Sequence, residues 1–116
     1  MKEESELQKS IVNWFRANFP DYIIFSVPNE AAYRSSNRFH ATGMLNGAPD
    51  LVCVLPRGTT LFLELKSTIG KQSTPQKLFE FSAKNLQHQY YIIRDLQDLK
   101  EVLRNNLYVD EWKNVL

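Results

Sequence analysis

The sequence predicts an α/β domain in which helices flank a mixed sheet, with the element order αβββαβα. Three observations predict it: an amphipathic helical pattern near the amino terminus, two apolar runs joined by a turn, and a capped helix followed by another apolar strand. With 116 residues, 43% of them hydrophobic, the chain can bury a core. No Pro- or Gly-rich linker divides it, so we expect one domain over residues 1–116, with 105–116 as a carboxyl-terminal extension.

The first expected element is a helix over residues 4–18. At about 100° per residue, Glu4 falls within about 40° of the centre of its apolar stripe, whereas Glu6 lies more than about 120° away. A carboxylate on a core-facing stripe is costly unless it binds something, which makes Glu4 a candidate site residue. The alternative is a frayed terminus on which Glu4 is solvated. The stripe consists of Leu7, Ile11, Trp14 and Phe15.

A strand over residues 22–27 follows and is stopped by Pro28. Residues 29–48 are mostly loop, which is long for a connector, and such loops are commonly functional or disordered. We expect this loop to contact the substrate. Its candidate contacts are Arg34, Arg38 and His40, although His40 is also explained as an ordinary loop histidine.

Residues 51–55 and 60–66 form the next two expected strands, joined by the turn residues Pro56-Arg57-Gly58. Period two places Glu64 and Lys66 on one face of the second strand. Asp50 stands at the entrance of the first strand, after the turn residues 47–49. If the strands pair, Asp50 lies across from the Glu64 end, so two carboxylates and an ammonium meet at one edge of the sheet.

This grouping indicates a metal centre. Two neighbouring carboxylates repel each other and raise one pKa unless a cation intervenes, and a hard divalent ion with oxygen ligands is the usual cation. Lys66 would then lie beside the attacking water. His40 and His88 are far apart and do not have the spacing of zinc ligands, and no Gly-x-Ser-x-Gly elbow supports a serine nucleophile.

The remaining elements are a helix over residues 74–87, a strand over 89–94 and a helix over 96–104. Thr74 is expected at the cap of the first of these helices, with Pro75 at its first position. Gln76 then lies in the first turn, close to the end of the 60–66 strand. It could bind a phosphate or the attacking water, and a simple surface role is the alternative. Residues 107–112 are expected to pack back on the core, and contact with a partner subunit is the alternative.

These motifs resemble the PD-(D/E)XK nuclease superfamily, and more narrowly its VRR-NUC branch. That branch has the pattern Gly-x-Pro-Asp, Glu-x-Lys, Gly and Ser-x-x-Gln after an amino-terminal Glu-x-x-x-Gln helix, and the resemblance covers about the first hundred residues in the expected order. It implies a restriction-endonuclease-like fold. The matching positions are Glu4 with Gln8, then residues 47–50, 64–66, Gly70 and residues 73–76.

The resemblance also implies a function: a metal-dependent DNA endonuclease that hydrolyses phosphodiester bonds. Asp50 and Glu64, helped by the Leu65 backbone carbonyl, would bind Mg²⁺, for which Mn²⁺ could substitute. Glu4 would bind the same ion through water or hold a second one, and Lys66 would orient or deprotonate the attacking water. Gln76 completes the catalytic group. The expected DNA contacts are Arg34, Arg38, His40, Lys71 and Lys77.

The substrate is expected to be DNA, and small domains of this branch suggest branched structures such as Holliday junctions, which a homodimer could cut in pairs. The alternative function is a non-catalytic nucleic-acid-binding module or a subunit of a larger nuclease complex. The net charge is only +1, but residues 31–48 and 65–79 contain bases and no acids. That local distribution favours a phosphate-binding surface, although ordinary solvated charge also explains it.

The compartment is expected to be the cytoplasm of a bacterium or a phage host. The single Cys53 lies in an apolar run and excludes a disulfide framework within one chain, which fits a reducing compartment. The first residues lack the basic and apolar segments of a signal peptide, and no apolar run approaches membrane-spanning length. We therefore expect a soluble, intracellular protein without a membrane partner.

Overall fold

The computed structural model describes residues 2–28 and 42–112, so the expected DNA contacts Arg34, Arg38 and His40 lie outside the described residues. Within these described residues, the predicted order αβββαβα is confirmed, and one further short helix follows it. The elements are α1 (Lys2–Asn18), β1 (Ile23–Ser26), β2 (Leu51–Leu55), β3 (Thr59–Leu65), α4 (Thr74–Asn85), β4 (Gln89–Ile93), α5 (Leu96–Arg104) and α6 (Val109–Trp112).

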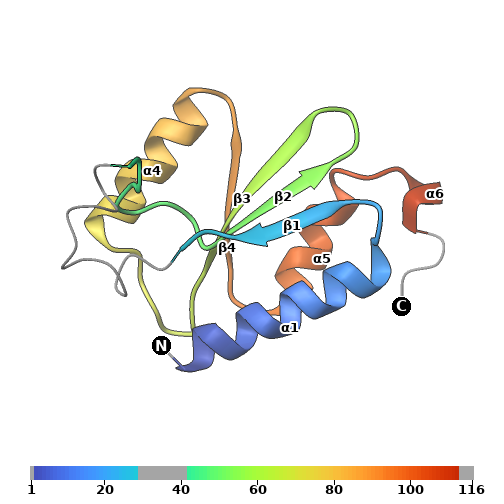
Figure 1. The fold of residues 1–116 in the computed structure, drawn as a ribbon, viewed down its shortest axis with the longest axis horizontal. Coiled ribbons are helices and arrows are strands. Elements are labelled where there is room, and N and C mark those ends of the chain that lie inside the picture. Colours follow the sequence, from blue (N-terminus) through green and yellow to red (C-terminus); the bar gives the residue numbers. More distant parts are fainter. Residues whose placement is uncertain (1, 29–41, 113–116) are drawn as a thin grey trace.

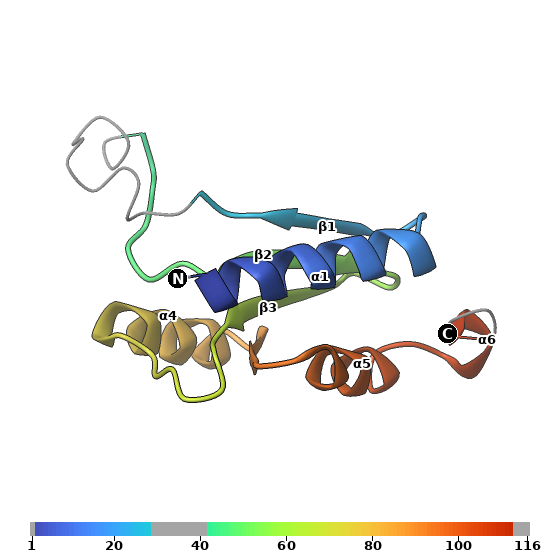
Figure 2. The same cartoon turned by 90° about the horizontal axis from the view of Figure 1, so that it is seen from below.

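The four strands form one mixed sheet in the order β1-β2-β3-β4. The β1–β2 and β2–β3 pairs are antiparallel, and β3–β4 is parallel. In Figure 1, α1 and α5 lie together on one side of the sheet, and α4 lies apart from them. Figure 2 shows α1 running alongside the strands, with α4 and α5 toward opposite ends of the molecule. This is the predicted α/β arrangement of a mixed sheet flanked by helices.

The main core lies between one face of the sheet and the pair α1 and α5. The leucines of β3 at positions 61, 63 and 65 are buried there against Ile11 and Phe15 of α1 and Leu99 and Leu103 of α5. The alternate residues of β3, Phe62 and Glu64, point to the other face, where the Phe62 ring meets Phe79 of α4 at 5.3 Å. The alternation along β3 therefore places apolar core residues on one face of the sheet and Glu64, a site residue, on the other.

Cys53 belongs to the same core and is fully buried. Burial raises the pKa of its thiol to about 12. Since the thiolate is the reactive form, Cys53 behaves as a small apolar core residue, as its place in the apolar run predicted.

The hairpin between β2 and β3 closes through a tight turn. Thr59 donates its amide to the Pro56 carbonyl at 3.4 Å, and both central residues have positive φ, 63° at Arg57 and 72° at Gly58. Two positive φ values in succession match the twist of a hairpin. The Arg57 side chain contacts Glu111, at 3.0 Å, and the Tyr108 ring, whose centroid lies 3.8 Å from the guanidinium carbon.

The start and the end of α4 differ from the sequence prediction. Ser73, not Thr74, is the cap: Ser73 Oγ accepts from the Gln76 amide at 3.3 Å, and Gln76 Oε1 accepts from the Ser73 amide at 2.8 Å. This reciprocal pair is a capping box. The helix ends at Asn85 because Gln87 has a φ of 69°, which a right-handed helix does not accommodate.

Other boundaries moved by one or two residues, as is common at the ends of elements. The strands expected over residues 22–27 and 89–94 are Ile23–Ser26 and Gln89–Ile93, the one expected over 60–66 is Thr59–Leu65, and the first helix begins at Lys2. The packing of residues 107–112 on the core is confirmed by Leu107, which is buried, and by Trp112, whose ring lies 5.6 Å from that of Phe19. No helix within residues 2–28 and 42–112 has the length and apolar character needed to cross a membrane.

Gly47 allows the segment before β2 to rest directly on the first turn of α4. It has a φ of +84°, and a Cβ at this position would lie 2.3 Å from the Pro75 carbonyl oxygen and 2.8 Å from the Gln76 amide nitrogen. Neither the backbone conformation nor the space accepts a side chain. The glycine therefore fixes the distance between the entrance of β2 and α4.

We expect Gly47→Ala to lower the free energy of unfolding by about 2–4 kcal/mol, because the strain of positive φ adds to a backbone clash. Gly58→Ala is the matched control: Gly58 has a φ of +72°, and a Cβ at this position would meet nothing within 4 Å. Its loss should be about 1 kcal/mol, from backbone strain alone. Urea unfolding of both variants measures the difference, and equal losses would contradict the close approach of Gly47 to α4.

Candidate active site

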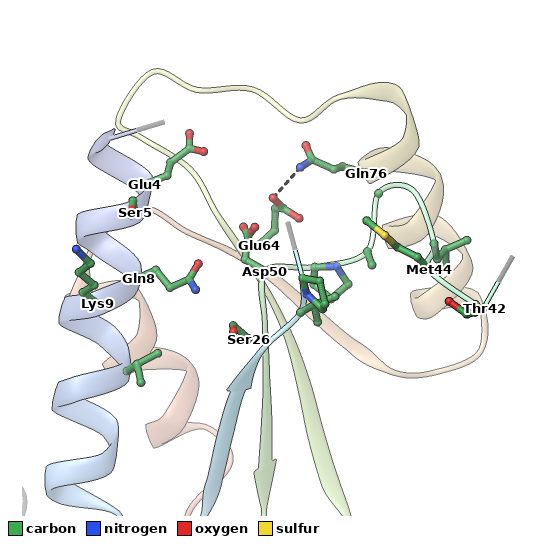
Figure 3. A pocket seen from close by; sticks show the side chains of 18 of the residues that line it. Glu4, Ser5, Gln8, Lys9, Ser26, Thr42, Met44, Asp50, Glu64 and Gln76 are labelled. Carbon is green, nitrogen blue, oxygen red and sulfur yellow. Dashed lines mark hydrogen bonds between the residues drawn. The ribbon is translucent and has the colours of Figure 1, made fainter. Parts of the chain in front are cut away.

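A cleft of about 1030 Å³ opens at the end of the sheet where β2 begins and β3 ends. Its walls are the amino-terminal half of α1, the segment 42–50 and the first turn of α4, with the end of β1 between them. Figure 3 shows Asp50 and Glu64 close together in this cleft, with Glu4 reaching in from α1 and Gln76 from α4. Four of the predicted catalytic residues therefore meet in one place.

Asp50 is fixed by the strands on both of its sides. The register pairs Leu51 with Leu63, which puts Asp50 opposite Glu64, as predicted. Asp50 Oδ2 accepts from the Leu65 amide at 2.7 Å, and the Asp50 carbonyl accepts from the Val27 amide at 2.9 Å. At the start of β2, the Asp50 side chain thus accepts from a backbone amide of β3, in place of a backbone carbonyl.

Glu64 is almost completely buried, with 1% of its surface exposed. Its Oε2 accepts from Gln76 Nε2 at 2.8 Å and lies 4.0 Å from Lys66 Nζ, and its Oε1 accepts from the Tyr90 hydroxyl at 3.4 Å. Burial first, and then the neighbouring Asp50, raise the pKa of Glu64 to about 9, against a smaller lowering by Lys66. In the protein without a cation, burial and Asp50 therefore both favour the protonated form of Glu64.

Glu4 faces the cleft, as the helical geometry predicted, whereas Glu6 is exposed. Glu4 Oε2 accepts from the backbone amide of Ser67, just after β3, at 3.2 Å. A Cβ on Gly70 would lie 3.3 Å from the same oxygen and 3.0 Å from Ser67 Oγ. The loop that follows β3 thus closes around the Glu4 carboxylate.

Lys66 lies on the same side of the strand as Glu64, as period two predicted. Its amide donates to the Ile93 carbonyl at 3.1 Å, which continues the parallel pairing with β4 by one residue. The residue is 9% exposed and its ammonium approaches Glu64, but it is not one of the residues that line the cleft. The ammonium therefore contacts Glu64, which lines the cleft, and does not line the cleft itself.

The other predicted site residues are distributed differently. Gln76 binds Glu64 and the Ser73 amide, so its side chain holds protein groups in this structure. Lys71, in the loop before α4, and Lys77, on α4, do not line the cleft. The Leu65 amide binds Asp50, and a role for the Leu65 carbonyl as a metal ligand stays a prediction.

Sequence reasoning missed Tyr90 and Gln72, which form a hydrogen-bonded chain to Glu64. Tyr90 of β4 is 3% exposed and contacts Glu64, and Gln72 donates to the Tyr90 hydroxyl at 3.2 Å. Alternation along residues 89–94 puts Tyr90 and Tyr91 on opposite faces. The parallel register, which pairs Phe62 with Tyr90, decides that Tyr90 shares the face of Glu64.

Arg94, also missed, holds the loop after β3. Its Nη1 donates to the carbonyls of Ser67 at 2.6 Å, Gly70 at 2.9 Å and Thr68 at 3.4 Å. Since Ser67 binds Glu4 through its amide, Arg94 helps to place the loop against the first turn of α1. A side chain that acts on backbone carbonyls in this way leaves no motif in the sequence.

In the part of the chain that the structure describes, no group of three or more His, Cys, Asp or Glu side chains is arranged to hold a metal ion. The donor set of Asp50 and Glu64 nevertheless fits a hard divalent cation. Both residues offer carboxylate oxygens, and the raised pKa of Glu64 reflects its burial and an adjacent acid, two penalties that a positive charge between the carboxylates would offset.

Comparisons with known proteins find similar solved structures, among them the two given below. No family model matches the sequence, and no curated protein does. A structure described as "VRR_NUC domain" has 20% identity and a TM-score of 0.67, covering 90% of this chain and 98% of the other. A second, "VRR_NUC domain protein", has 22% identity and a TM-score of 0.70, covering 93% and 88%. The chain has the VRR_NUC domain fold. The resemblance drawn from the motifs is thus confirmed at the level of the fold.

In this VRR_NUC fold, we expect Glu64 to make the metal-free protein less stable as the pH rises. Between about pH 4.5 and pH 9 the unfolded chain loses the Glu64 proton while the folded chain keeps it, so the unfolding free energy falls across this window. Glu64→Gln stays neutral, and its melting temperature should fall less with rising pH.

Thermal melts in EDTA across this pH range measure the effect. Glu6→Gln removes an exposed carboxylate on α1 and is the control that should keep the wild-type slope. An unchanged slope in Glu64→Gln would show that another group carries the pH dependence.

Proposed function

We propose that this domain is a metal-dependent DNA endonuclease that hydrolyses phosphodiester bonds. The observation that carries the proposal is the meeting of Asp50, Glu64 and Lys66 at one end of the sheet, with Leu65 N to Asp50 Oδ2 at 2.7 Å and Lys66 Nζ to Glu64 Oε2 at 4.0 Å. The motif resemblance and the VRR_NUC fold support it. Function is argued from the site, because a fold alone does not determine chemistry.

In the proposed site, Asp50 and Glu64 hold Mg²⁺ or Mn²⁺, with the Leu65 carbonyl as a further ligand. When bound, the ion supplies positive charge to the scissile phosphate and activates a water for attack. Glu64 would bind the ion as a carboxylate, so it would have to release any proton that it carries when the ion binds. Glu4, which lines the same cleft, contacts the ion through water or holds a second one.

Lys66 and Gln76 have separate roles in this proposal. The Lys66 ammonium orients the attacking water and counters the negative charge that builds on the phosphate in the transition state. Gln76 donates to Glu64 at 2.8 Å while its oxygen caps α4, so it couples the orientation of Glu64 to the position of the helix. Removal of either residue should affect chemistry more than DNA binding.

The DNA is proposed to enter from the cleft side. Lys71 and Lys77 lie on the loop before α4 and on α4, and Lys9 of α1 lines the cleft. Each would neutralise a backbone phosphate, together with Arg34, Arg38 and His40 of the segment that precedes residue 42. Branched DNA is the proposed substrate, and a homodimer would cut it on two strands. We place this activity in the cytoplasm.

We expect the purified protein to cleave DNA with Mg²⁺ or Mn²⁺ and not with EDTA. Lys66→Ala should lower the rate by about 100-fold or more, because a cation at the developing charge is lost. Lys100→Ala is the control, since Lys100 lies on α5 beside the Trp14 ring. Labelled four-way junction, flap, single-stranded and duplex DNA would rank the substrates, and paired symmetric cuts in the junction would support a dimer.

The rival function is a nucleic-acid-binding module that does not cleave. It predicts binding to one of these DNA substrates in EDTA, with no product on any of them when metal is present. That outcome, obtained with protein that is folded by circular dichroism, would replace the endonuclease proposal.

Glu4 and Glu6 offer a matched test within one turn of α1. Glu4→Gln should lower cleavage by about 10- to 100-fold, because it removes a carboxylate that orients the ion or its water. Glu6→Gln, which alters an exposed side chain, should leave the rate unchanged. Steady-state rates at several Mg²⁺ concentrations compare the two, and equal rates would remove Glu4 from the proposed site.

A further inference from the structure

A chain of hydrogen bonds connects Glu64 to α4 through the carboxylate oxygen that Gln76 does not contact. Its central residue is Tyr90, which lies on β4 and is 3% exposed. The Tyr90 hydroxyl lies 3.4 Å from Glu64 Oε1 and 3.2 Å from Gln72 Nε2. The proposed mechanism gives Tyr90 no contact with DNA and no part in the chemistry.

The direction of these hydrogen bonds follows from the groups themselves. Gln72 Nε2 also donates to Glu80 Oε1 at 3.0 Å, and Glu80 is paired with Lys84 at 2.6 Å. The Glu80 carboxylate can only accept, so the nitrogen of the Gln72 amide must face it, and the same nitrogen can only donate to Tyr90. The Tyr90 oxygen therefore accepts a hydrogen bond from Gln72. This leaves the Tyr90 hydroxyl hydrogen to be donated to Glu64.

Glu64 is consequently held at both of its oxygens. Oε2 accepts from Gln76 on α4, and Oε1 accepts from Tyr90 on β4. Two donors on different elements restrict rotation of the carboxyl group about its last bond. A carboxylate that binds a cation must present its remaining lone pairs in one direction, and outer-shell hydrogen bonds commonly set that direction.

We propose that Tyr90 and Gln72 are positioning residues that fix the orientation in which Glu64 presents its carboxylate to the divalent cation. This inference rests on the proposed role of Glu64 as a metal ligand. Tyr90 touches neither the cation nor the DNA in this proposal; it acts through Glu64. Gln72 acts one step further away, by orienting the Tyr90 hydroxyl.

The purely structural explanation is that Tyr90 only fills space. Its ring packs 6.0 Å from that of Phe79, and phenylalanine would keep this contact. Tyr90→Phe therefore separates the two explanations, because it removes the hydroxyl and retains the ring. Tyr91→Phe is the matched control: the Tyr91 hydroxyl donates to Gln89 Oε1 at 2.5 Å and lies on the other face of β4.

The first measurement is Mn²⁺ binding to the protein without DNA, by electron paramagnetic resonance or calorimetry. We expect Tyr90→Phe to weaken binding by about tenfold or more, the usual effect of losing an outer-shell partner. Tyr91→Phe should bind as the wild type does. Both variants should keep the wild-type circular dichroism spectrum.

The second measurement asks whether Gln72 acts through Tyr90. Gln72→Ala should weaken Mn²⁺ binding in the wild-type background and add little in the Tyr90→Phe background, because the two residues form one chain. In DNA cleavage, raising the Mg²⁺ concentration should recover most of the rate that Tyr90→Phe loses. A residue needed only for folding would not show this recovery.

The outcomes separate this inference from the proposed function. Wild-type affinity for Mn²⁺ in Tyr90→Phe, with metal-dependent cleavage intact in the wild type, would overturn the positioning role alone. Failure of the wild-type protein to bind Mn²⁺ or Mg²⁺ would overturn both the inference and the endonuclease proposal. Weaker binding in Tyr90→Phe and in Gln72→Ala, but not in Tyr91→Phe, would support the inference.

Discussion

The pairing of β2 with β3 is the constraint on which the rest of the site depends. Its register places Leu51 opposite Leu63 and hence Asp50 opposite Glu64, and the Asp50 carboxylate secures that end through the Leu65 amide. A slip of one residue would turn Glu64 toward the leucine core, because successive side chains of a strand point to opposite faces. The alternating hydrophobic pattern of β3 therefore favours the register that places Glu64 opposite Asp50.

The burial of Glu64 raises the free energy of its charged form, and side chains from neighbouring elements contact its carboxyl group. Ionising it without a cation is unfavourable, because both burial and Asp50 oppose the charge. Gln76, Tyr90 and Lys66 each come from a different segment and each reduce that penalty or fix the carboxyl group. The site is thus assembled by tertiary contacts. Glu64, whose ionisation is unfavourable without a cation, is also the residue proposed to bind the cation.

The stability of local structure and the geometry of the site are coupled at two loops. Gln76 uses its oxygen for the cap of α4 and its nitrogen for Glu64, and Gly47 allows the entrance of β2 to rest on the same turn. After β3, Arg94 binds three carbonyl groups of the loop, and this loop offers the Ser67 amide to Glu4. Small changes in either loop should therefore move carboxylates as well as alter stability.

The sequence by itself determined the order of the elements, the alternation of β3 and the inward face of Glu4, because these depend on periodicity and turn residues within short segments. It also indicated that Asp50 and Glu64 would meet, since a short turn leaves two adjacent strands one simple pairing. Only the tertiary structure decided which tyrosine of β4 contacts Glu64, because a parallel partner distant in the sequence sets that register. The same holds for the cap at Ser73 and the loop contacts of Arg94, where the choice among neighbouring polar groups depends on what packs against them.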